Sequence, residues 1–366
     1  MSKRIVIVGA GPAGCYTAQL LKIYGFKPVL IEEHPEVGRP VHCTGIIGSR
    51  IFSENAPFPI PKTSIINVIN GAFIHYGKEN FSISRKKVAY IVDRENFDKN
   101  LSRDLDILFD NKFLGLERNE RGYIVQTDKE EINADIVIGA EGANSSLRKI
   151  INPDKSVRSY RGLQLKMKTK PRRRDFVEVF LKENSFLWIV PEKDDFVRIG
   201  TISENPHRDL SVFLKERKIE GELIGKFGGL ASIGICEHTV KDDIALVGDA
   251  ACQIKPLSYG GVYFGLKCAA ILASCIKDGR LDDYDRLWKR NFASEIKIGL
   301  KAKDVYSKLK KEEVRDIFNF LKGQKKIIEV TGDFENHGQL LLQIIRRPAN
   351  LPQIAGILKV LLKNVI

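Results

Sequence analysis

The N-terminal segment KRIVIVGAGPAGCYTAQLLKIYGFKPVLIEE, residues 3–33, constrains the fold of this chain more than any other feature. An apolar run typical of a buried parallel strand leads into Gly9, Gly11 and Gly14, which stand in the spacing GxGxxG before a helical stretch. A second apolar strand follows and ends at Glu32. Because strand, glycine turn, helix, strand and acid occur in this order, the segment predicts a Rossmann-like α/β fold that binds a dinucleotide.

Each residue type in this motif has a physical reason. The first glycine permits the tight turn, the second lets the backbone approach a pyrophosphate, and the third allows close packing of helix and strand. The helix N-terminus directs its amides at the phosphate, and the acid at the strand end can bind ribose hydroxyls. NAD and FAD share this pattern, so other segments must distinguish them. The predicted cofactor-binding residues of this segment are Gly9, Gly11, Ala13, Gly14, Glu32 and Glu33.

Composition narrows the class of protein. The 366 residues are 43% hydrophobic and 29% charged, an ordinary balance for a soluble globular chain. The net charge of +13 could attract nucleic acid, anionic lipid or an acidic protein, but the basic residues are scattered and no base-stacking module is visible, so we expect no nucleic acid partner. The six cysteines form no CxxC pair and no metal-ligand spacing, which predicts reduced thiols, no metal and a cytoplasmic protein. The chain begins almost in a strand, so no signal peptide is expected, and residues 260–276 predict a buried helix rather than a membrane span.

Two later segments distinguish the cofactors. DIVIGAEGANSSLRK (135–149) and IALVGDAACQIKPLSYGGVYFGLKCA (244–269) resemble the second and third flavin fingerprints of the para-hydroxybenzoate hydroxylase fold. This resemblance implies FAD, with Asp249 on the ribityl chain and the amides near the start of the last helix facing the flavin pyrimidine. A helix N-terminus there would stabilise the negative charge of reduced flavin. The further cofactor contacts that the resemblance implies are Leu114, Gly142, Pro256, Gly260, Gly261 and Val262.

Within that fold, three segments resemble the geranylgeranyl reductase family, which saturates isoprenoid double bonds. They are GRPVHCTG (38–45), VDRENFDKNLS (92–102) and ENSFLWIVP (183–191). The resemblance covers residues 1 to about 285. In the aromatic motif of the third segment only Trp188 and Pro191 match fully, and Glu141 replaces an aspartate of the second fingerprint. The resemblance implies flavin contacts by Arg39, Cys43, Thr44, Gly45 and Arg94, and substrate contacts by Phe186, Trp188 and Tyr259.

The rest of the chain predicts two further parts. Apolar and polar residues alternate over residues 58–88 and 158–239, which predicts an antiparallel substrate-binding sheet. The FAD-binding domain is then discontinuous and comprises residues 1–57, 89–157 and 240–285. Residues 286–366 predict a helical C-terminal region, whose ending RRPANLPQIAGILKVLLKNVI resembles an amphipathic helix. Such a helix would rest on the inner face of an anionic membrane or pack against the domain.

The function that the resemblance implies is saturation of geranylgeranyl chains, in archaeal-type ether lipids or their precursors, by hydride transfer from reduced FAD. Reduced ferredoxin or NAD(P)H would supply the electrons. Cys43 would gate the substrate channel, relay a proton or merely fill space, and His42 is the less favoured relay. Two alternatives remain open at this point: an FAD-dependent aromatic monooxygenase of the same fold, and a non-catalytic prenyl carrier.

Overall fold

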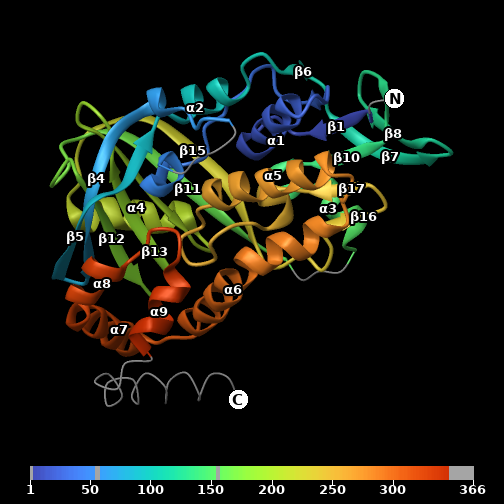
Figure 1. Cartoon of the computed structure of the whole chain (residues 1–366). Helices are drawn as coiled ribbons and strands as arrows, with labels where there is room; N and C mark the ends of the chain where they lie inside the picture. Colours follow the sequence, from blue (N-terminus) through green and yellow to red (C-terminus); the bar gives the residue numbers. More distant parts are fainter. Residues whose placement is uncertain (1–2, 54–57, 154–156, 346–366) are drawn as a thin grey trace.

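The computed structural model describes residues 3–53, 58–153 and 157–345 of the chain. In Figure 1 the N-terminal strand and its helix form one end of the molecule, a large curved sheet forms the other, and the C-terminal helices lie beneath both. All described residues therefore belong to one mixed α/β architecture, as the sequence predicts.

A six-stranded sheet carries the nucleotide motif. Its strand order is β16-β17-β10-β1-β2-β6, and every neighbouring pair is parallel except β16 with β17. The helices α1 (Pro12–Ile23) and α5 (Val262–Lys277) pack against each other and share the largest apolar core. The predicted buried helix is thus confirmed as α5. The strands of this sheet are β1 (Ile5–Val8), β2 (Val29–Ile31), β6 (Asp106–Leu108), β10 (Ile136–Gly139), β16 (Val240–Lys241) and β17 (Ile244–Leu246).

An eight-stranded sheet forms the other end, in the order β15-β11-β14-β13-β12-β4-β5-β3. The sequence predicts an antiparallel sheet, and all pairs are antiparallel except β4 with β12, which are parallel. These two strands come from stretches of chain separated by the nucleotide fold, so no hairpin fixes their direction. The strands are β3 (Ile46–Gly48), β4 (Ile65–Tyr76), β5 (Glu79–Val92), β11 (Arg158–Lys168), β12 (Phe176–Lys182), β13 (Ser185–Pro191), β14 (Phe196–Ile202) and β15 (Glu222–Ile233).

The expected domain boundary at residue 88/89 falls inside β5, which continues to Val92. Strand β3 pairs with β5 in the large sheet, although its residues lie within the stretch 1–57 expected in the FAD-binding domain. The chain therefore passes from one end of the molecule to the other within a continuous strand. The reason is that the backbone pairing of β5 extends past the residue at which the alternation of apolar and polar residues ends.

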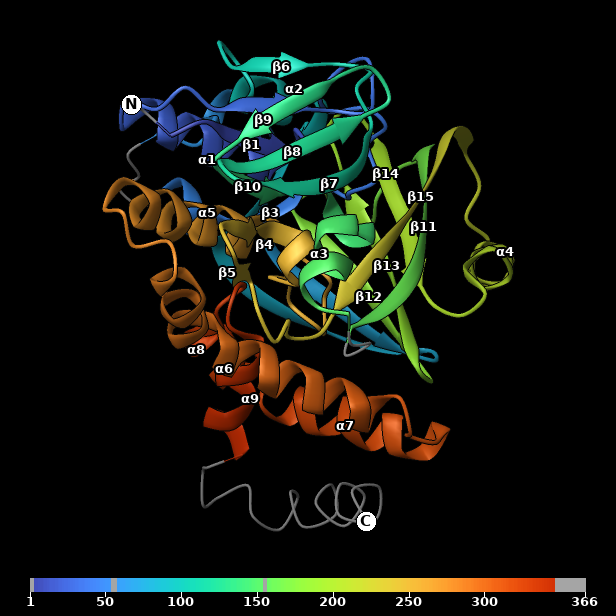
Figure 2. The same cartoon turned by 90° about the vertical axis from the view of Figure 1, so that its right-hand side faces the viewer.

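The two faces of the eight-stranded sheet have different neighbours. One face presents an apolar core that includes Leu163, Leu165 and Ile199 and is covered by α4 (Pro206–Arg217) through Leu210 and Phe213. Figure 2 shows α4 on the outer side of these strands. Side chains at alternate positions point the other way, toward the nucleotide fold. We call this second surface the inner face of the sheet.

A small three-stranded sheet covers the six-stranded sheet on the side opposite α1. Its residues Tyr123 and Val125 pack against Val6 and Val8 of β1 in a second apolar core. Figure 2 shows this sheet lying over β1 and β10. The small sheet closes one side of the nucleotide fold and leaves the flavin segments facing the large sheet. Its strands are β7 (Phe113–Asn119), β8 (Gly122–Thr127) and β9 (Glu131–Ala134).

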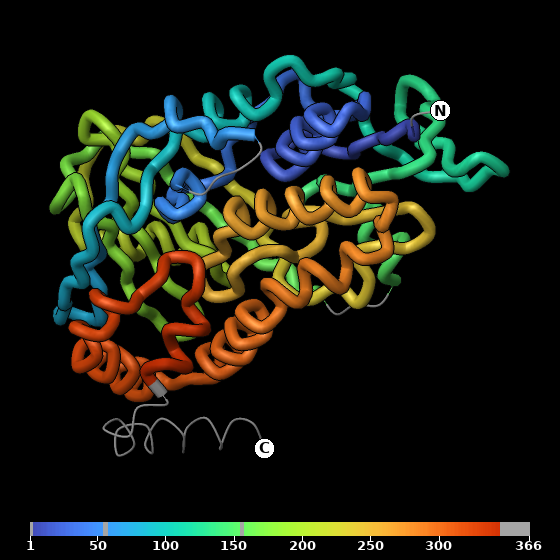
Figure 3. Tube along the Cα trace, viewed as in Figure 1, coloured from blue at the N-terminus to red at the C-terminus, as the bar shows by residue number. Residues whose placement is uncertain are grey.

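The C-terminal region is helical over its described part, as the sequence predicts. The segment between α8 and α9 lies next to residues 48–53. In the tube of Figure 3 the first segment is red and the second is light blue. The predicted amphipathic ending, residues 346–366, lies outside the described residues. The described helices of this region are α6 (Asp283–Tyr306), α7 (Lys311–Gly323), α8 (Lys325–Thr331) and α9 (His337–Ile345). Two short α-helices elsewhere in the described residues are α2 (Arg94–Leu101) and α3 (Ser146–Ile151).

Candidate FAD and substrate site

The glycine turn after β1 has the geometry that a pyrophosphate requires. Gly9 has φ +102°, and a Cβ on it would lie 2.5 Å from the carbonyl oxygen of Ala140. A Cβ on Gly14 would lie 2.1 Å from the carbonyl oxygen of Gly9, so only glycine fits at either position. Around Gly11, by contrast, no atom lies within 4 Å of the Cβ position. The turn is therefore closed by packing on one side and open where a phosphate would approach.

Helix α1 presents free amides to this opening. Its N-cap is Gly11, no side chain caps it, and its first turn carries no acidic residue. At the end of β2, the Glu32 carboxylate accepts hydrogen bonds from Ala10 N at 2.8 Å and His34 N at 3.1 Å, which fixes it beside the turn. These features fit the pyrophosphate and the adenosine ribose of a dinucleotide. The side chain of Glu33 is exposed, and Leu114 on β7 is 63% exposed.

The third flavin segment places an unsatisfied carboxylate at a second helix N-terminus. Asp249 lies in a short 3₁₀ turn, Gly248–Ala251, and its carboxylate accepts no hydrogen bond from any residue in the described ranges. Burial raises the pKa of the Asp249 carboxyl, although Arg94 and Arg148 oppose that rise. A Cβ on Gly261, the uncapped N-cap of α5, would lie 2.3 Å from Asp249 Oδ1. A half-buried carboxylate that accepts no hydrogen bond from the described residues, next to free helix amides, fits ribityl hydroxyls and the flavin ring.

Residues 135–149, which resemble the second flavin fingerprint, hold the turn that carries Asp249 in place. Glu141, where an aspartate was expected, accepts hydrogen bonds from Ser146 N at 2.9 Å and Leu147 N at 3.3 Å at the start of α3. Arg148 of the same helix donates to the carbonyl oxygens of Asp249 and Ala250, at 3.1 and 3.2 Å. The longer acid thus caps α3 while the helix holds the 3₁₀ turn in place. Gly142, with φ +75°, has open space at its Cβ position.

Cys43 lies half-buried in the loop that precedes β3, and its Sγ accepts a hydrogen bond from Gly45 N at 3.4 Å. Gly45 has φ +76°, and a Cβ there would lie 2.4 Å from the carbonyl oxygen of Val92, so the loop packs tightly on β5. Arg94, at the start of α2, donates from Nε and Nη2 to the two carboxylate oxygens of Asp98, at 3.1 and 2.9 Å. Burial opposes the charge of Arg94, but Asp98 and Cys43 outweigh it and raise the pKa of the guanidinium.

Of the other predicted loop residues, Thr44 is half-buried and Arg39 is exposed. Arg39 pairs with Glu95 at 2.9 Å and Glu36 at 3.2 Å, so its observed role is a surface ion pair. Partial burial lowers the pKa of the His42 imidazole, so His42 is neutral near pH 7.

Two residues that sequence reasoning missed connect this loop to the inner face of the large sheet. Gln164 Nε2 donates to the carbonyl oxygen of His42 at 3.0 Å, and Arg198 Nη1 donates to that of Cys43 at 3.2 Å. Arg198 is itself held by an ion pair with buried Glu192. Arg198 left a sequence signal, because it interrupts the apolar run FVRI, whereas Gln164 stands at a regular polar position of the alternating run LQLKM.

The predicted substrate residues come together at the turn that leads into α5, residues 255–261, which we call the flavin turn. Phe186 and Trp188 lie two residues apart on β13, with ring centroids 5.7 Å apart, and Phe186 stacks on Tyr259 at 6.4 Å. The indole lies over Gly200, whose Cβ position is 2.3 Å from Trp188 Cζ2. Tyr259 adopts φ +58° directly before Gly260. We call Phe186, Trp188 and Tyr259 the aromatic wall.

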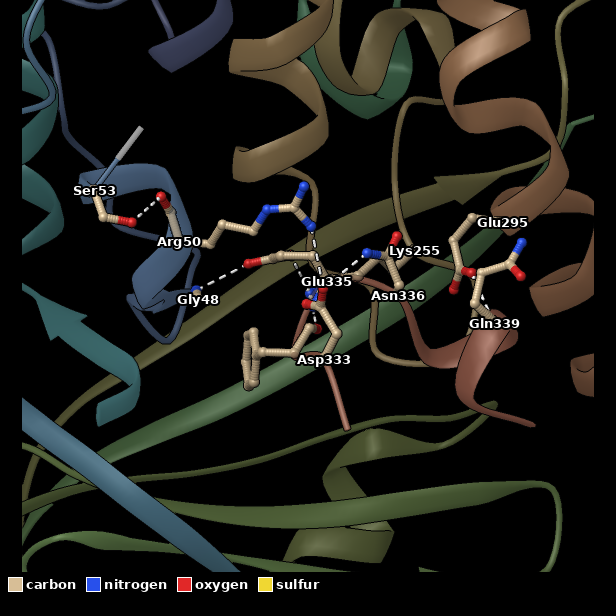
Figure 4. A network of polar contacts seen from close by, with 10 residues as sticks. Gly48, Arg50, Ser53, Lys255, Glu295, Asp333, Glu335, Asn336 and Gln339 are labelled. Atoms are coloured by element: carbon tan, nitrogen blue, oxygen red, sulfur yellow. Dashed lines mark hydrogen bonds and ion pairs between the residues drawn. The ribbon is translucent and has the colours of Figure 1, made fainter. Parts of the chain in front are cut away.

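The C-terminal region reaches the same turn through a buried polar network. Lys255, just before Pro256, forms an ion pair at 2.7 Å with Glu335, and both side chains are 5% exposed or less. Glu335 also accepts from Gly48 N at 3.0 Å, while Arg50 pairs with Asp333 at 3.1 Å, as Figure 4 shows. Residues 333–339 thus connect β3 with the loop that enters α5. The sequence resemblance ended near residue 285 and did not indicate this contact.

Comparison with known proteins agrees with this geometry. Residues 3–172 match the family described as pyridine nucleotide-disulphide oxidoreductase. An uncharacterized protein of Methanocaldococcus jannaschii is 32% identical, with 93% of this chain and 94% of that protein covered. The digeranylgeranylglycerophospholipid reductase of Methanococcus vannielii is 28% identical, with 95% and 96% covered.

Solved structures show the same fold. A geranylgeranyl bacteriochlorophyll reductase-like protein from Thermoplasma acidophilum matches with a TM-score of 0.81 at 21% identity, over 98% of this chain and 99% of that one. The flavin-dependent halogenase CmlS matches with a TM-score of 0.67 at 16% identity, over 98% and 78%. FAD is the cofactor that this fold and these residues accommodate.

Two findings concern the described part of the chain only. Residues 3–53, 58–153 and 157–345 contain no cluster of His, Cys, Asp and Glu able to hold a metal ion. In the same ranges, no helix has the length and apolarity needed to cross a bilayer.

The glycine turn, the free Asp249 carboxylate, the uncapped α5 and the near full-length relatives lead to one assignment. The chain belongs to the geranylgeranyl reductase family of FAD-dependent oxidoreductases.

Proposed function

We propose that this protein saturates the carbon–carbon double bonds of geranylgeranyl chains, in archaeal-type ether lipids or their precursors. The observation that carries this proposal is the aromatic wall beside the uncapped N-terminus of α5, where Phe186 stacks on Tyr259. A wall of aromatic rings suits a long apolar chain. The reductase names of the relatives support the same substrate class.

The chain's own residues would bind and orient the cofactor. Glu32 and Asp249 would accept hydrogen bonds from ribose and ribityl hydroxyls, and the α1 amides would hold the pyrophosphate. The positive end of α5 would stabilise negative charge at the flavin pyrimidine. Bound FAD, once reduced, would supply the hydride that an alkene carbon accepts.

An unactivated alkene gives the protein little to polarise, so the remaining residues would act by positioning and by excluding water. The aromatic wall would hold the chain and keep the site dry. Cys43 Sγ would hold the proton destined for the second alkene carbon or gate the approach of the chain. Gln164 and Arg198 fix the two carbonyls beside it, so the loop has a defined position from which to do either.

Electrons would come from reduced ferredoxin or from NAD(P)H. The net charge of +13 favours a small acidic protein donor through electrostatic attraction. The same charge favours contact with an anionic membrane at the cytoplasmic face, where the lipid substrate would reside.

The test is anaerobic reduction of the purified protein with dithionite in the presence of a digeranylgeranyl lipid, followed by mass spectrometry. The proposal predicts products that gain two hydrogens for each double bond saturated. An unchanged lipid, together with oxygen-dependent hydroxylation of an aromatic compound, would instead favour the monooxygenase alternative. A protein purified without FAD would favour the carrier.

A further inference from the structure

Lys303 is a buried cation for which the structure provides no counterion. It lies on α6, and the residue is 8% exposed. Lys303 Nζ makes no hydrogen bond or ion pair with any residue in the described ranges. Its nearest partners are two aromatic rings, with the centroid of Tyr160 at 4.6 Å and that of Tyr259 at 4.8 Å. Tyr259 belongs to the aromatic wall, so this ammonium lies beside the proposed substrate site.

The helical periodicity of α6 shows that this burial is part of the fold. Trp288, Ile296 and Gly299 are buried on the same face, at spacings of three, four or eight residues that end at Lys303. Gly299 packs against Pro256 of the flavin turn, with its Cβ position 2.9 Å from Pro256 Cδ. The lysine is therefore directed inward by the same helix face that contacts the turn.

The charged neighbours leave Lys303 cationic but poorly compensated. Burial and, to a smaller extent, the charge of Arg158 lower the pKa of Lys303 to about 8, and Asp304 partly opposes this change. Asp304 is already engaged in an ion pair with Arg158 on β11. The other titratable groups facing the ammonium are the phenols of Tyr160 and Tyr259. At pH 7 the side chain thus stays mostly protonated, with aromatic faces as its main compensation.

Two further buried donors in this cluster have no acceptor. Tyr259 Oη and Trp188 Nε1 are both buried without a hydrogen-bond partner in the described ranges. The Lys303 ammonium lies over the Tyr259 ring, so this phenol and the ammonium are neighbouring donors, and the indole N–H of Trp188 lies at the far side of Phe186. Buried donors are ordinarily satisfied. The complement of such a set is a group rich in acceptor oxygens and negative charge.

We propose that Lys303 and Tyr259 form an anion site that binds the phosphate or diphosphate group of a phosphorylated prenyl substrate, with the apolar chain lying along Phe186 and Trp188. This proposal rests on the proposed function, because it assigns the headgroup end of the same site. An amphiphile matches the cluster better than a free anion does, since the cation and the apolar rings are contiguous. Anchoring one end of the chain would also decide which double bond meets the flavin.

The test measures binding to the FAD-loaded protein by calorimetry, with geranylgeranyl diphosphate, uncharged geranylgeraniol and inorganic pyrophosphate as three probes. Lys303→Met should weaken diphosphate binding by at least about 10-fold, because a charge-assisted contact is lost, and leave geranylgeraniol within about 2-fold. Lys303→Arg should keep most of the affinity for the diphosphate. Lys301→Met, an exposed lysine on the same helix, is the matched control and should change neither.

Two further readouts separate the anion site from a structural lysine. Affinity of the wild type for geranylgeranyl diphosphate should fall as the pH rises above about 8, where Lys303 loses its proton, and Lys303→Met should abolish that dependence. Lys303→Met should also be at least as resistant to thermal unfolding as the wild type, because it replaces a buried unpaired charge by an apolar side chain of similar length. If the variant does not fold, the pH profile and Lys303→Arg still decide.

Equal weakening of diphosphate and alcohol binding in Lys303→Met would overturn the proposal, as would pH-independent binding by the wild type. Pyrophosphate binding as tightly as geranylgeranyl diphosphate would overturn the assignment to a prenyl substrate and indicate a site for free anions. None of these readouts requires turnover. Failure to reduce any prenyl chain would therefore contradict the proposed function and leave the anion site to be judged separately.

Discussion

The two ends of the molecule present different kinds of binding groups. The nucleotide end presents backbone amides at two uncapped helices and the carboxylates of Glu32 and Asp249, all supplied by short local segments. The inner face of the large sheet presents side chains such as Trp188 and Arg198, which converge from separate strands. Under the proposed function, local motifs would determine how the cofactor binds, whereas tertiary packing would determine how the substrate binds. Changes at the two ends should therefore have separable effects, which the following variants test.

The largest effect is expected at the nucleotide end, from Gly14→Ala. The added methyl would lie 2.1 Å from the carbonyl oxygen of Gly9, and overpacking this severe should cost about 3 kcal/mol or more of unfolding free energy. We expect a large drop in melting temperature and loss of most bound FAD, measured by thermal unfolding and flavin absorbance. Gly323→Ala is the control, because its Cβ position is open, and it should retain both. A stable yellow Gly14→Ala protein would contradict the packing account of the turn.

A smaller effect at the same end is expected from Asp249→Asn. Replacing a charged acceptor of ribityl hydroxyls by an amide should weaken FAD binding by roughly 10- to 100-fold, which corresponds to about 1.5 to 3 kcal/mol. The apoprotein should keep its fold, because no described residue donates a hydrogen bond to this carboxylate. FAD titration monitored by fluorescence measures the effect, with exposed Glu120→Gln as the control. Unchanged FAD affinity would show that Asp249 does not contact the cofactor.

The opposite end should respond in the opposite way to Trp188→Ala. Removing the indole opens the aromatic wall over Gly200, so turnover of a geranylgeranyl chain should fall roughly 10- to 100-fold through misplacement of the substrate. FAD content should remain near that of the wild type, and Trp188→Phe should recover part of the activity. Steady-state kinetics with flavin quantification separates the two quantities. A parallel loss of FAD and activity would mean that Trp188 belongs to a common core, and the separation of the two ends would fail.

The smallest expected effect concerns the loop between the two ends. Gln164→Leu removes the hydrogen bond to the His42 carbonyl, a contribution of about 1 kcal/mol, and should loosen the Cys43 loop. Because the other five cysteines are buried, alkylation by iodoacetamide reports on Cys43 first. We expect alkylation several-fold faster than in the wild type, followed by mass spectrometry of the labelled peptide. Gln126→Leu in the small sheet is the control, and equal rates in both variants would exclude a role of Gln164 in holding the loop.

The contrast between the ends also explains what the sequence could reveal. The glycine turn and the Gly-Asp segment were predictable because their function depends on neighbours along the chain, and both stand where expected. Phe186 and Trp188 were predictable as a pair on one face, because strand periodicity requires it. The resemblance named Tyr259 as a further substrate residue, but only the structure shows that Phe186 stacks on it.

The parts that the sequence did not reveal depend on long-range contacts. The Lys255–Glu335 ion pair joins positions 80 residues apart, and no local pattern relates them. Gln164 and Arg198 reach the Cys43 loop across more than 100 residues of chain. Lys303 left a signal, a charge on the buried face of a periodic helix, but only the structure shows which rings surround it. The sequence can thus reveal a buried polar residue within an apolar pattern, but it does not show which residues that side chain contacts.

The most direct test of the reductase assignment is a single-turnover measurement under strict anaerobiosis. The protein is reduced with one equivalent of dithionite and mixed either with digeranylgeranyl lipid or with its fully saturated counterpart of equal length. The account predicts that the flavin absorbance returns only with the unsaturated lipid, with one double bond lost for each flavin reoxidised. Flavin that stays bleached with both lipids, or that reoxidises equally with both, would contradict the assignment.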